Sequence, residues 1–294
     1  MRYAKRFLHR IQEDFLIVGA YDYDDLLKAG SLHDRFLEIS MDALYCLRFF
    51  PDVEYLILTP GEISADDMSM LNGLNVKALK LDYYTYDSDV YTIDLAKFPS
   101  LELVFARTQY CVNNISQCQS LQTLIVQEWL TSDLTILRNS AIKALKICSG
   151  KLKSLSGLET LPKLISLSIS NQRQLVDCTS LASVFLESIE ITSCSKVDVT
   201  VFSSMPALRM MHISGRQKIP NVASILSIAP KLEWLLLDHV VTEGELTLLH
   251  GLSHAVIFSD CRHYSHKNCD LPKSTKRFRS NFLPLELEIL PEAY

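Results

Sequence analysis

The run CRHYSHKNC, residues 261–269, contains four side chains of the types that bind zinc: Cys261, His263, His266 and Cys269. Structural zinc sites usually join two ligand pairs from separate segments. These four residues would instead have to wrap one ion through three successive short loops. We therefore expect a polar C-terminal loop in this region, with no bound metal.

Acid–base chemistry could use His212, Asp238 and His239, which can fall near one another if they lie on adjacent strands. Nucleophilic catalysis also needs a nucleophile next to its base, and the sequence places none beside these three residues. A Gly-rich phosphate loop and a G-x-S-x-G motif are both absent. The sequence therefore predicts a protein without catalytic activity and without a cofactor.

The run DYYTYDSDVY, residues 82–91, combines acidic and aromatic side chains. Tyrosine is enriched among interface anchors because it offers a large contact area at low entropy cost, and aspartates beside it would select a basic partner. The expected anchors are Tyr83, Tyr84 and Tyr86, and the expected steering residues are Asp82, Asp87 and Asp89. The alternative is a loop whose tyrosines pack on their own repeat and whose aspartates cap the next turn.

The charge of the chain is unevenly distributed. Its formal net charge is -5, but residues 11–102 contain 18 acids and 6 bases, which give -12. Residues 262–279 contain 6 bases and 1 acid, which give +5. The acidic part favours a basic partner. The basic part lies at one end of a chain with a pI of about 5.9, so we expect a solvated cap or a salt-bridging patch there, and no nucleic-acid partner.

Composition gives an expectation for the cellular compartment. The eight cysteines are scattered and form no CxxC pair, which is typical of reduced thiols. Near the N-terminus the apolar residues are interrupted by Gln12, Glu13 and Asp14, so no secretory signal is predicted. No segment approaches the ~18 apolar residues of a membrane span. We expect a cytoplasmic protein without a membrane partner.

A repeated sequence pattern predicts the strands that position these residues. Ten hexapeptides fit L-x-x-L-x-L when L is read as any apolar residue, with 29 of the 30 such positions apolar and starts 20 to 25 residues apart. They begin at Val53, Val76, Leu101, Leu121, Ile142, Leu164, Leu186, Leu208, Leu232 and Ser253. The L-x-L alternation indicates a short strand that buries its apolar face only by stacking on its neighbours.

The chain resembles leucine-rich repeat proteins over about residues 50–260, and its 22-residue spacing is similar to that of the bacterial internalin-like class. The resemblance implies an α/β solenoid: a leucine-rich repeat horseshoe with a parallel β-sheet on the concave face and short helices or 3₁₀ turns outside. The family usually has Asn, sometimes Cys, eight residues after the first Leu, and this chain has no Asn there, so we expect uneven turns. The residues at those positions are Gly61, Tyr84, Gln109, Trp129, Gly150, Gln172, Cys194, Arg216, Val240 and Cys261.

Three regions are predicted from the limits of the repeat. Residues 1–50 have helix-like apolar spacing and would cap the N-terminal end of the core. Residues 51–260 would form about ten repeats. Residues 261–294 would form a C-terminal cap, in which the alternating run PLELEIL, residues 284–290, reads as a closing strand.

Side chains that alternate with the core leucines would line the concave face. Ten strands at ~4.8 Å spacing would span roughly 43 Å, which suits a protein partner rather than a small molecule. Besides residues 82–91, the candidate contact residues are Tyr55, Lys80, Phe105, Arg107, Glu128, Trp234, Asp238 and His239. The pattern favours a protein-binding module, in its most specific form a cytoplasmic bacterial inhibitor of the immunity type that binds a basic protein. The alternative is a scaffold, adaptor or secreted effector that uses the same surface, and an enzyme comes third.

Overall fold

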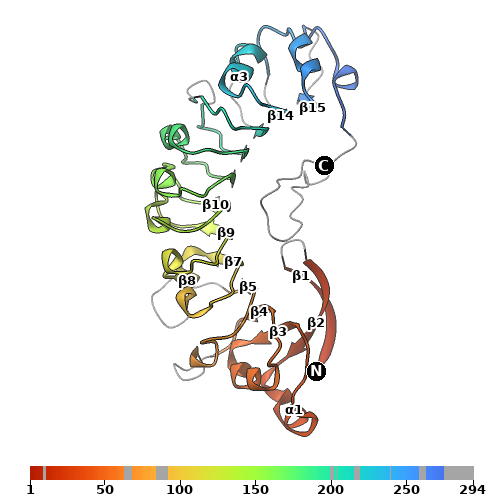
Figure 1. Cartoon of the computed structure of the whole chain (residues 1–294). Coiled ribbons are helices and arrows are strands. Elements are labelled where there is room, and N and C mark those ends of the chain that lie inside the picture. The colour runs from red at the N-terminus through yellow and green to blue at the C-terminus, as the bar shows by residue number, and fades with distance from the viewer. Residues whose placement is uncertain are drawn as a thin grey trace. The chain divides into compact units, whose positions relative to one another are not determined.

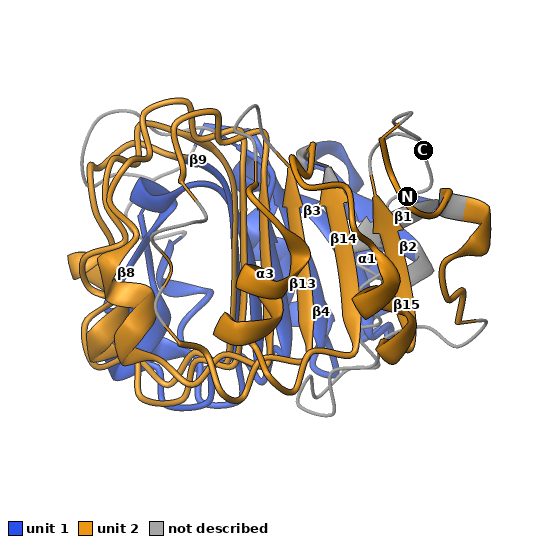
Figure 2. Cartoon of the chain, turned by 90° about the horizontal axis from the view of Figure 1, so that it is seen from above, with its two compact units in different colours: residues 1–128 blue, residues 129–294 orange. Residues whose placement is uncertain are grey.

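The structure is a computed structural model of the chain (Figure 1). It describes residues 1–8, 11–62, 68–83, 92–198, 202, 204–214, 219–238, 240–257 and 263–274. The chain divides into two compact units, residues 1–128 and 129–294, which Figure 2 shows in different colours.

In the first unit the main sheet has the order β1-β2-β3-β4-β5-β7-β9. β1 and β2 pair antiparallel, and all later neighbours pair parallel. The strands of this sheet are β1 Arg2–Leu8, β2 Ile11–Val18, β3 Phe36–Ser40, β4 Tyr55–Thr59, β5 Ala78–Leu81, β7 Leu103–Thr108 and β9 Thr123–Trp129. A small second sheet pairs β6 Ile93–Asp94 with β8 Val112–Asn113. The helices are α1 Tyr23–Ala29 and the 3₁₀ helices η1 Ala20–Asp22, η2 Met41–Phe49, η3 Leu95–Lys97, η4 Gln109–Cys111 and η5 Ile115–Gln117.

In the second unit the strands run in chain order from β10 to β15, and all neighbours pair parallel. They are β10 Ala144–Gly150, β11 Ser166–Ser170, β12 Ser188–Thr192, β13 Met210–Ser214, β14 Trp234–Asp238 and β15 His254–Ile257. The helices are α3 Val222–Ile228 and the 3₁₀ helices η6 Thr135–Leu137, η7 Leu158–Thr160, η8 Thr179–Ser183, η10 Thr247–Gly251 and η11 Asn268–Asp270. Seen along the stack, the short helices lie on the side opposite the strands (Figure 2).

The apolar positions of the repeat make the core of each unit. Leu167 of β11 lies in register between Leu145 of β10 and Ile189 of β12, and these three side chains are at most 2% exposed. Ser168, the next residue, points to the other face and is half-buried. All ten strands that the hexapeptide pattern predicts are present, as are the predicted short outer helices.

The prediction of a helical cap over residues 1–50 is wrong for three of its elements. β1 and β2 form a hairpin, and β3 already pairs parallel with β4, so the repeat strands begin before residue 51. Phe15 and Leu16 are neighbours in β2, yet both are buried. A continuous apolar run of this kind is compatible with a helix or with a strand covered on both faces, and periodicity cannot distinguish the two. Helical structure is confined to α1, η1 and η2.

A column of capping side chains begins the outer turns. Its members accept a hydrogen bond from a backbone N–H two or three residues later: Asp94, Asp133, Ser154, Asp177, Asn221 and Glu245. Four of them also take part in a hydrogen bond between neighbouring repeats. Asn114 donates to Asp94 at 2.9 Å, Ser154 to Asp177 at 2.7 Å, and Ser265 to Glu245 at 3.0 Å. This capping column therefore ties successive outer turns together.

The positions where the family usually has Asn are filled by side chains of very different size. Trp129 and Gln172 are fully buried, and the Gln172 Oε1 accepts the backbone N–H of Leu152 at 3.2 Å in the preceding repeat. Gly150 has φ +135°, and a Cβ there would lie 1.9 Å from the Trp129 carbonyl oxygen. The turns therefore differ from one repeat to the next, as predicted from the missing Asn ladder.

None of the helices among the described residues combines the length with the apolar character that a membrane span requires. Of the C-terminal region, only residues 263–274 are described, and the predicted closing strand at 284–290 lies outside them. The predicted cap over 261–294 therefore stays a prediction.

Candidate protein-binding surface

We call the side of the sheet that carries the residues alternating with the core leucines the open face. In the first unit its half-buried members are Lys80, Asp82, Phe105, Arg107 and Gln127, on the neighbouring strands β5, β7 and β9 or directly after them. Period-two alternation places them on one side, because Leu79, Leu81 and Val104 fill the core between them. The hydrogen-bonded strands hold the backbone of these contact residues in place.

The charges of this patch are paired with one another. Lys80 Nζ lies 3.2 Å from Asp82, and Arg107 Nε donates to Asp82 at 2.7 Å. Arg107 also donates to Gln127, and Lys80 lies over the Phe105 ring, 5.7 Å from its centroid. Burial acts to raise the pKa of Asp82, but the hydrogen bond from Arg107 and the charge of Lys80 outweigh it and hold that pKa below its usual value. Asp82 is therefore an ionised carboxylate already neutralised by two cations.

Two predicted tyrosine contacts are buried instead. Tyr83, expected to anchor a partner, is 4% exposed, and burial raises its pKa well above the usual value. It continues the alternation of Leu79 and Leu81, which sends it into the core. Tyr55 does lie on the open face, but it is 9% exposed because it stacks on Phe36, with ring centroids 4.6 Å apart. The prediction of Tyr83 as a contact residue is wrong, and Tyr55 offers little surface.

Aromatic rings and paired ions surround Tyr55. Phe15 of β2 meets Phe36 edge to face at 5.5 Å, and the Arg35 guanidinium lies 5.9 Å from the Tyr55 ring centroid. Glu54 accepts from Arg35 and, at 3.0 Å, from Lys77. Hydrogen bonds from these two bases lower the pKa of Glu54. Glu54, like Asp82, is therefore an acidic residue of the N-terminal third whose charge is paired with two basic side chains.

Several predicted contact residues fall outside this patch. Tyr84, Tyr86, Asp87, Asp89 and His239 lie outside the described residues. Glu128 is half-buried near the end of β9, in register with Thr108. Asp238 ends β14, in register with Ser214, and its side chain is outside the described set.

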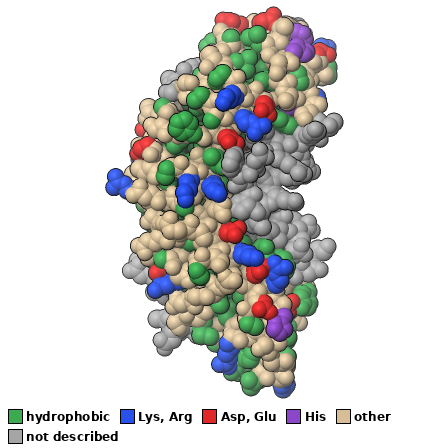
Figure 3. Space-filling view, viewed as in Figure 1, with side chains coloured by type: hydrophobic (Ala, Val, Ile, Leu, Met, Phe, Trp, Pro, Cys, Tyr) green, Lys and Arg blue, Asp and Glu red, His purple; other side chains and the backbone are tan. Residues whose placement is uncertain are grey.

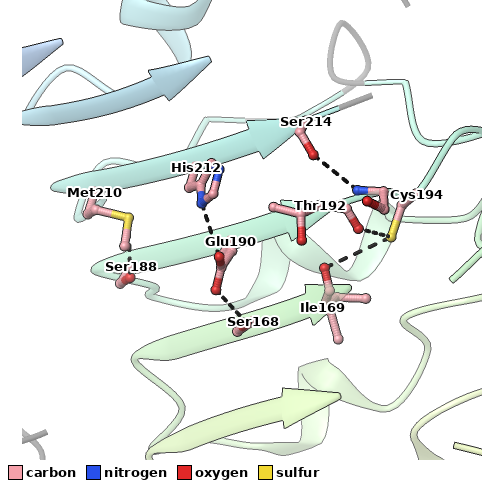
Figure 4. A network of polar contacts seen from close by, with 10 residues as sticks. Ser168, Ile169, Ser188, Glu190, Thr192, Cys194, Met210, His212 and Ser214 are labelled. Atoms are coloured by element: carbon pink, nitrogen blue, oxygen red, sulfur yellow. Dashed lines mark hydrogen bonds and ion pairs between the residues drawn. The ribbon is translucent and has the colours of Figure 1, made fainter. Parts of the chain in front are cut away.

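In the second unit the open face carries a polar chain across three strands (Figure 4). The Ser168 hydroxyl donates to Glu190 at 2.6 Å, and His212 Nδ1 lies 3.0 Å from the other oxygen of Glu190. Burial acts to raise the pKa of Glu190, but the hydrogen bonds from His212 and Ser168 outweigh it and lower that pKa. The carboxylate sits between the serine and the histidine, so the histidine has no contact through which it could take the serine proton.

Trp234 lies on the open face of β14, the strand next to β13, and stacks on His254 of β15, with ring centroids 4.5 Å apart. Both side chains are half-buried, as are Leu236 and Val256 beside them. His254 and Glu190 were not among the predicted contact residues. The repeat period could have found both, because Glu190 and His212 follow Ser168 at 22-residue intervals and His254 follows Trp234 by one repeat.

The described residues of the CRHYSHKNC run make local contacts. His263 Nε2 lies 2.9 Å from the Val241 carbonyl oxygen, and His266 packs edge to face on His250 and contacts the Ser265 hydroxyl. Cys269 is exposed, and Cys261 is outside the described residues. Within the described part of the chain, no group of three or more His, Cys, Asp or Glu side chains could hold a metal ion.

On the face of the molecule seen in Figure 3, acidic side chains are scattered, and several of them lie beside basic ones. This mixing matches the ion pairs of the open face, where Asp82 and Glu190 each have a basic or hydrogen-bonding neighbour. Although the N-terminal third has a net negative charge, the acidic residues described on its open face are paired with bases, so this face is not an acidic surface.

No protein-family model matches the chain, and no curated protein matches it. Among solved structures, the internalin InlF of Listeria monocytogenes str. 4b F2365 is similar, at 15% sequence identity and a TM-score of 0.45. The match covers 72% of this chain and 75% of that chain. The parallel ladders, the ten repeat strands and the short outer helices give this chain the leucine-rich repeat fold.

Proposed function

We propose that this chain is a non-enzymatic protein-binding module whose contact surface is the open face of its sheet. One observation carries the proposal: side chains of mixed chemistry are presented half-exposed on hydrogen-bonded parallel strands. Lys80, Phe105 and Arg107 lie side by side on β5 and β7, and Trp234 and His254 on β14 and β15. A rigid scaffold lowers the entropy cost of binding, because its contact groups are already in position.

The dimensions favour a protein partner. At ~4.8 Å between strands, the five parallel strands β3 to β9 span roughly 19 Å and the six strands β10 to β15 roughly 24 Å. Aromatic residues and arginine are enriched among the residues that dominate protein interfaces, and both occur here. Phe105 and Arg107 would make the main contacts in the first unit, and Trp234 in the second.

The non-enzymatic part of the proposal is supported by the arrangement of the polar groups. In Ser168–Glu190–His212, the serine hydroxyl donates to a carboxylate that is already paired with the histidine, so the serine lacks the imidazole contact of a Ser–His pair. Asp82 is held by Lys80 and Arg107, which leaves it no proton to transfer near neutral pH.

The finer form of the proposal is a cytoplasmic inhibitor of the immunity type that binds a basic protein. Its support is the net charge of -12 over residues 11–102. Because Asp82 and Glu54 are already paired with bases, selection for a basic partner would depend on Asp87 and Asp89. Removing those two carboxylates should slow association with the partner and weaken its dependence on salt.

The test is affinity capture with matched variants of the full chain. Wild type and Phe185→Ala, which truncates a side chain 75% exposed, should capture the same protein. The double variant Phe105→Ala, Trp234→Ala should lose it, since truncating one central anchor typically costs ~2 kcal/mol or more. Capture that survives the double variant would show that binding uses another surface.

A further inference from the structure

The N-terminal hairpin crosses in front of the open face of the first unit. β1 and β2 pair over seven residues, whereas β2 pairs with β3 through three residues, Leu16, Ile17 and Val18. The Cα atoms of β1 and β5 come within 8 Å of each other, although β2, β3 and β4 lie between these strands in the sheet order. Four strand intervals would separate them by ~19 Å in a flat sheet. The hairpin therefore bends out of the sheet.

The bend is directed towards the open face. In Figure 1 and in Figure 2, β3 and β4 lie between the hairpin and β8, which belongs to the outer side of the unit. Glu38, Ile57 and Lys80 occupy one row of the open face, in register across β3, β4 and β5. Ile57 is 1% exposed and both Glu38 and Tyr55 are 9% exposed, whereas Lys80 is half-buried. The open-face side chains of β3 and β4 are therefore covered, and the hairpin is the described element that lies over them.

We propose that the β1–β2 hairpin is a lid over Tyr55 and Ile57, and that the protein partner displaces it to contact these side chains together with Lys80 and Phe105. The displacement rests on the proposed function, whereas the opening of the lid does not. Uncovering Tyr55 and Ile57 exposes apolar surface to water, which is unfavourable. The partner must therefore place an apolar side chain where the hairpin lies in the free protein.

The hairpin has an apolar base and a polar outer part. At the base, Phe15, Leu16 and Val18 are buried. Beyond it, residues 5–14 read KRFLHRIQED, in which three of the ten residues are apolar. Segments that bury little apolar surface open locally at low cost in free energy, while the rest of the protein stays folded. The ladder between β1 and β2 is internal to the hairpin, so the lid can open at its base without breaking that ladder.

The reactivity of a cysteine placed beneath the hairpin measures the opening of the lid. In the full chain, Ile57→Cys should react with iodoacetamide at least about tenfold more slowly than Phe105→Cys, because its thiol reacts only in the open fraction of molecules. Phe105 continues the same row on β7 and is half-buried. Mass spectrometry of the digested protein separates the introduced thiol from the native cysteines. Tyr55→Cys, on the same strand and face, provides a second labelling site.

A proline in β1 provides the variant that opens the lid. Two residues connect Leu8 to Ile11, so this pair is hydrogen-bonded, and the alternation of an antiparallel ladder makes Ala4 and Phe15 a hydrogen-bonded pair as well. Ala4→Pro removes the N–H of that pair and should speed labelling of Ile57→Cys at least about fivefold. Ala4→Ser keeps the N–H and should leave the labelling rate unchanged.

Two native cysteines distinguish lid opening from unfolding of the unit. Cys46 and Cys111 are fully buried in the first unit and should stay unlabelled in every variant. Equal labelling rates of Ile57→Cys in the Ala4→Pro and Ala4→Ser backgrounds would overturn the lid. So would labelling of the introduced thiol in step with Cys46 and Cys111, or labelling of Ile57→Cys as fast as Phe105→Cys.

The lid and the proposed function can fail separately. Labelling needs no partner, so faster labelling in Ala4→Pro without capture of any protein would reject the proposed function and leave the lid in place. With a captured protein in hand, Ala4→Pro should retain more of it than Ala4→Ser, because the closed lid no longer competes. Equal retention by the two variants would overturn the displacement of the lid by the partner.

Discussion

Replacing Leu167 by alanine tests the register on which the fold and the open face both depend. Leu167 is 1% exposed and lies between Leu145 and Ile189. The substitution removes three carbon atoms, worth ~2.4 kcal/mol at ~0.8 kcal/mol for each buried methylene. The cavity left between two neighbouring strands adds to this, so the free energy of unfolding should fall by ~2–5 kcal/mol.

The adjacent residue is the matched control. Ser168→Ala removes the hydroxyl that donates to Glu190 at 2.6 Å, but Glu190 keeps its contact with His212. The expected cost is about 1.5 kcal/mol, at the low end for a hydrogen bond to a charged group, because the site is half-buried and Glu190 keeps its second partner. Urea unfolding followed by circular dichroism measures both variants, with an unchanged slope as the check that the same unit unfolds. Equal losses for the two variants, or a larger loss for Ser168→Ala, would refute the register.

The remaining predictions concern one turn and two titrating groups. Gly150→Ala should lower the free energy of unfolding by more than about 2 kcal/mol, because its Cβ would lie 1.9 Å from the Trp129 carbonyl oxygen at φ +135°; a thermal midpoint equal to that of wild type would contradict this. Hydrogen bonds from the side chain and backbone of Thr247 lower the pKa of Glu245 from 4.5 to about 2. Its stabilising effect is therefore present above pH 4.5 and is lost as the pH falls to about 2, so Glu245→Gln should show a weaker acid dependence of stability than wild type over that interval. Burial, followed by the charge of Lys273, lowers the pKa of His254 from 6.5. Its neutral form accepts the Ser274 N–H, so this contact is complete above pH 6.5 and is lost as the pH falls through the lowered pKa; the protection factor of the Ser274 amide against hydrogen exchange, measured relative to the intrinsic rate at each pH, should fall there and not in His254→Asn.

The strands of the repeat could be predicted from sequence because each needs only local information. Leu79 and Leu81 are buried, while Lys80 between them faces out, and this period of two is visible in any one hexapeptide. The same alternation continues to Tyr83 and indicates that its side chain is buried. The acidic and aromatic composition of residues 82–91 instead suggested that the whole stretch is exposed. For Tyr83, the strand alternation predicts the position of the side chain correctly and the composition of the stretch does not.

The charges of the open face could not be read from composition. Asp82 and Arg107 are 25 residues apart in sequence, yet they form an ion pair, because they occupy equivalent positions of adjacent repeats. A net charge summed along the chain counts both and shows nothing of their pairing. The hairpin of β1 and β2 was missed for another reason: its apolar run is equally compatible with a helix, and the pairing that decides between them is a tertiary contact.

The capping column has a consequence for how the chain acquires its structure. Each cross-repeat bond of the column joins residues about one repeat apart, as do the strand pairs; Ser154 and Asp177, for example, are 23 residues apart in the sequence. Contacts of such short sequence separation are reached quickly, and stacked repeats fold by propagation from a neighbour that is already formed. During synthesis, each repeat that leaves the ribosome would find the surface it needs completed by the one before it. Growth from the N-terminal end would then expose a single unpaired strand edge at a time.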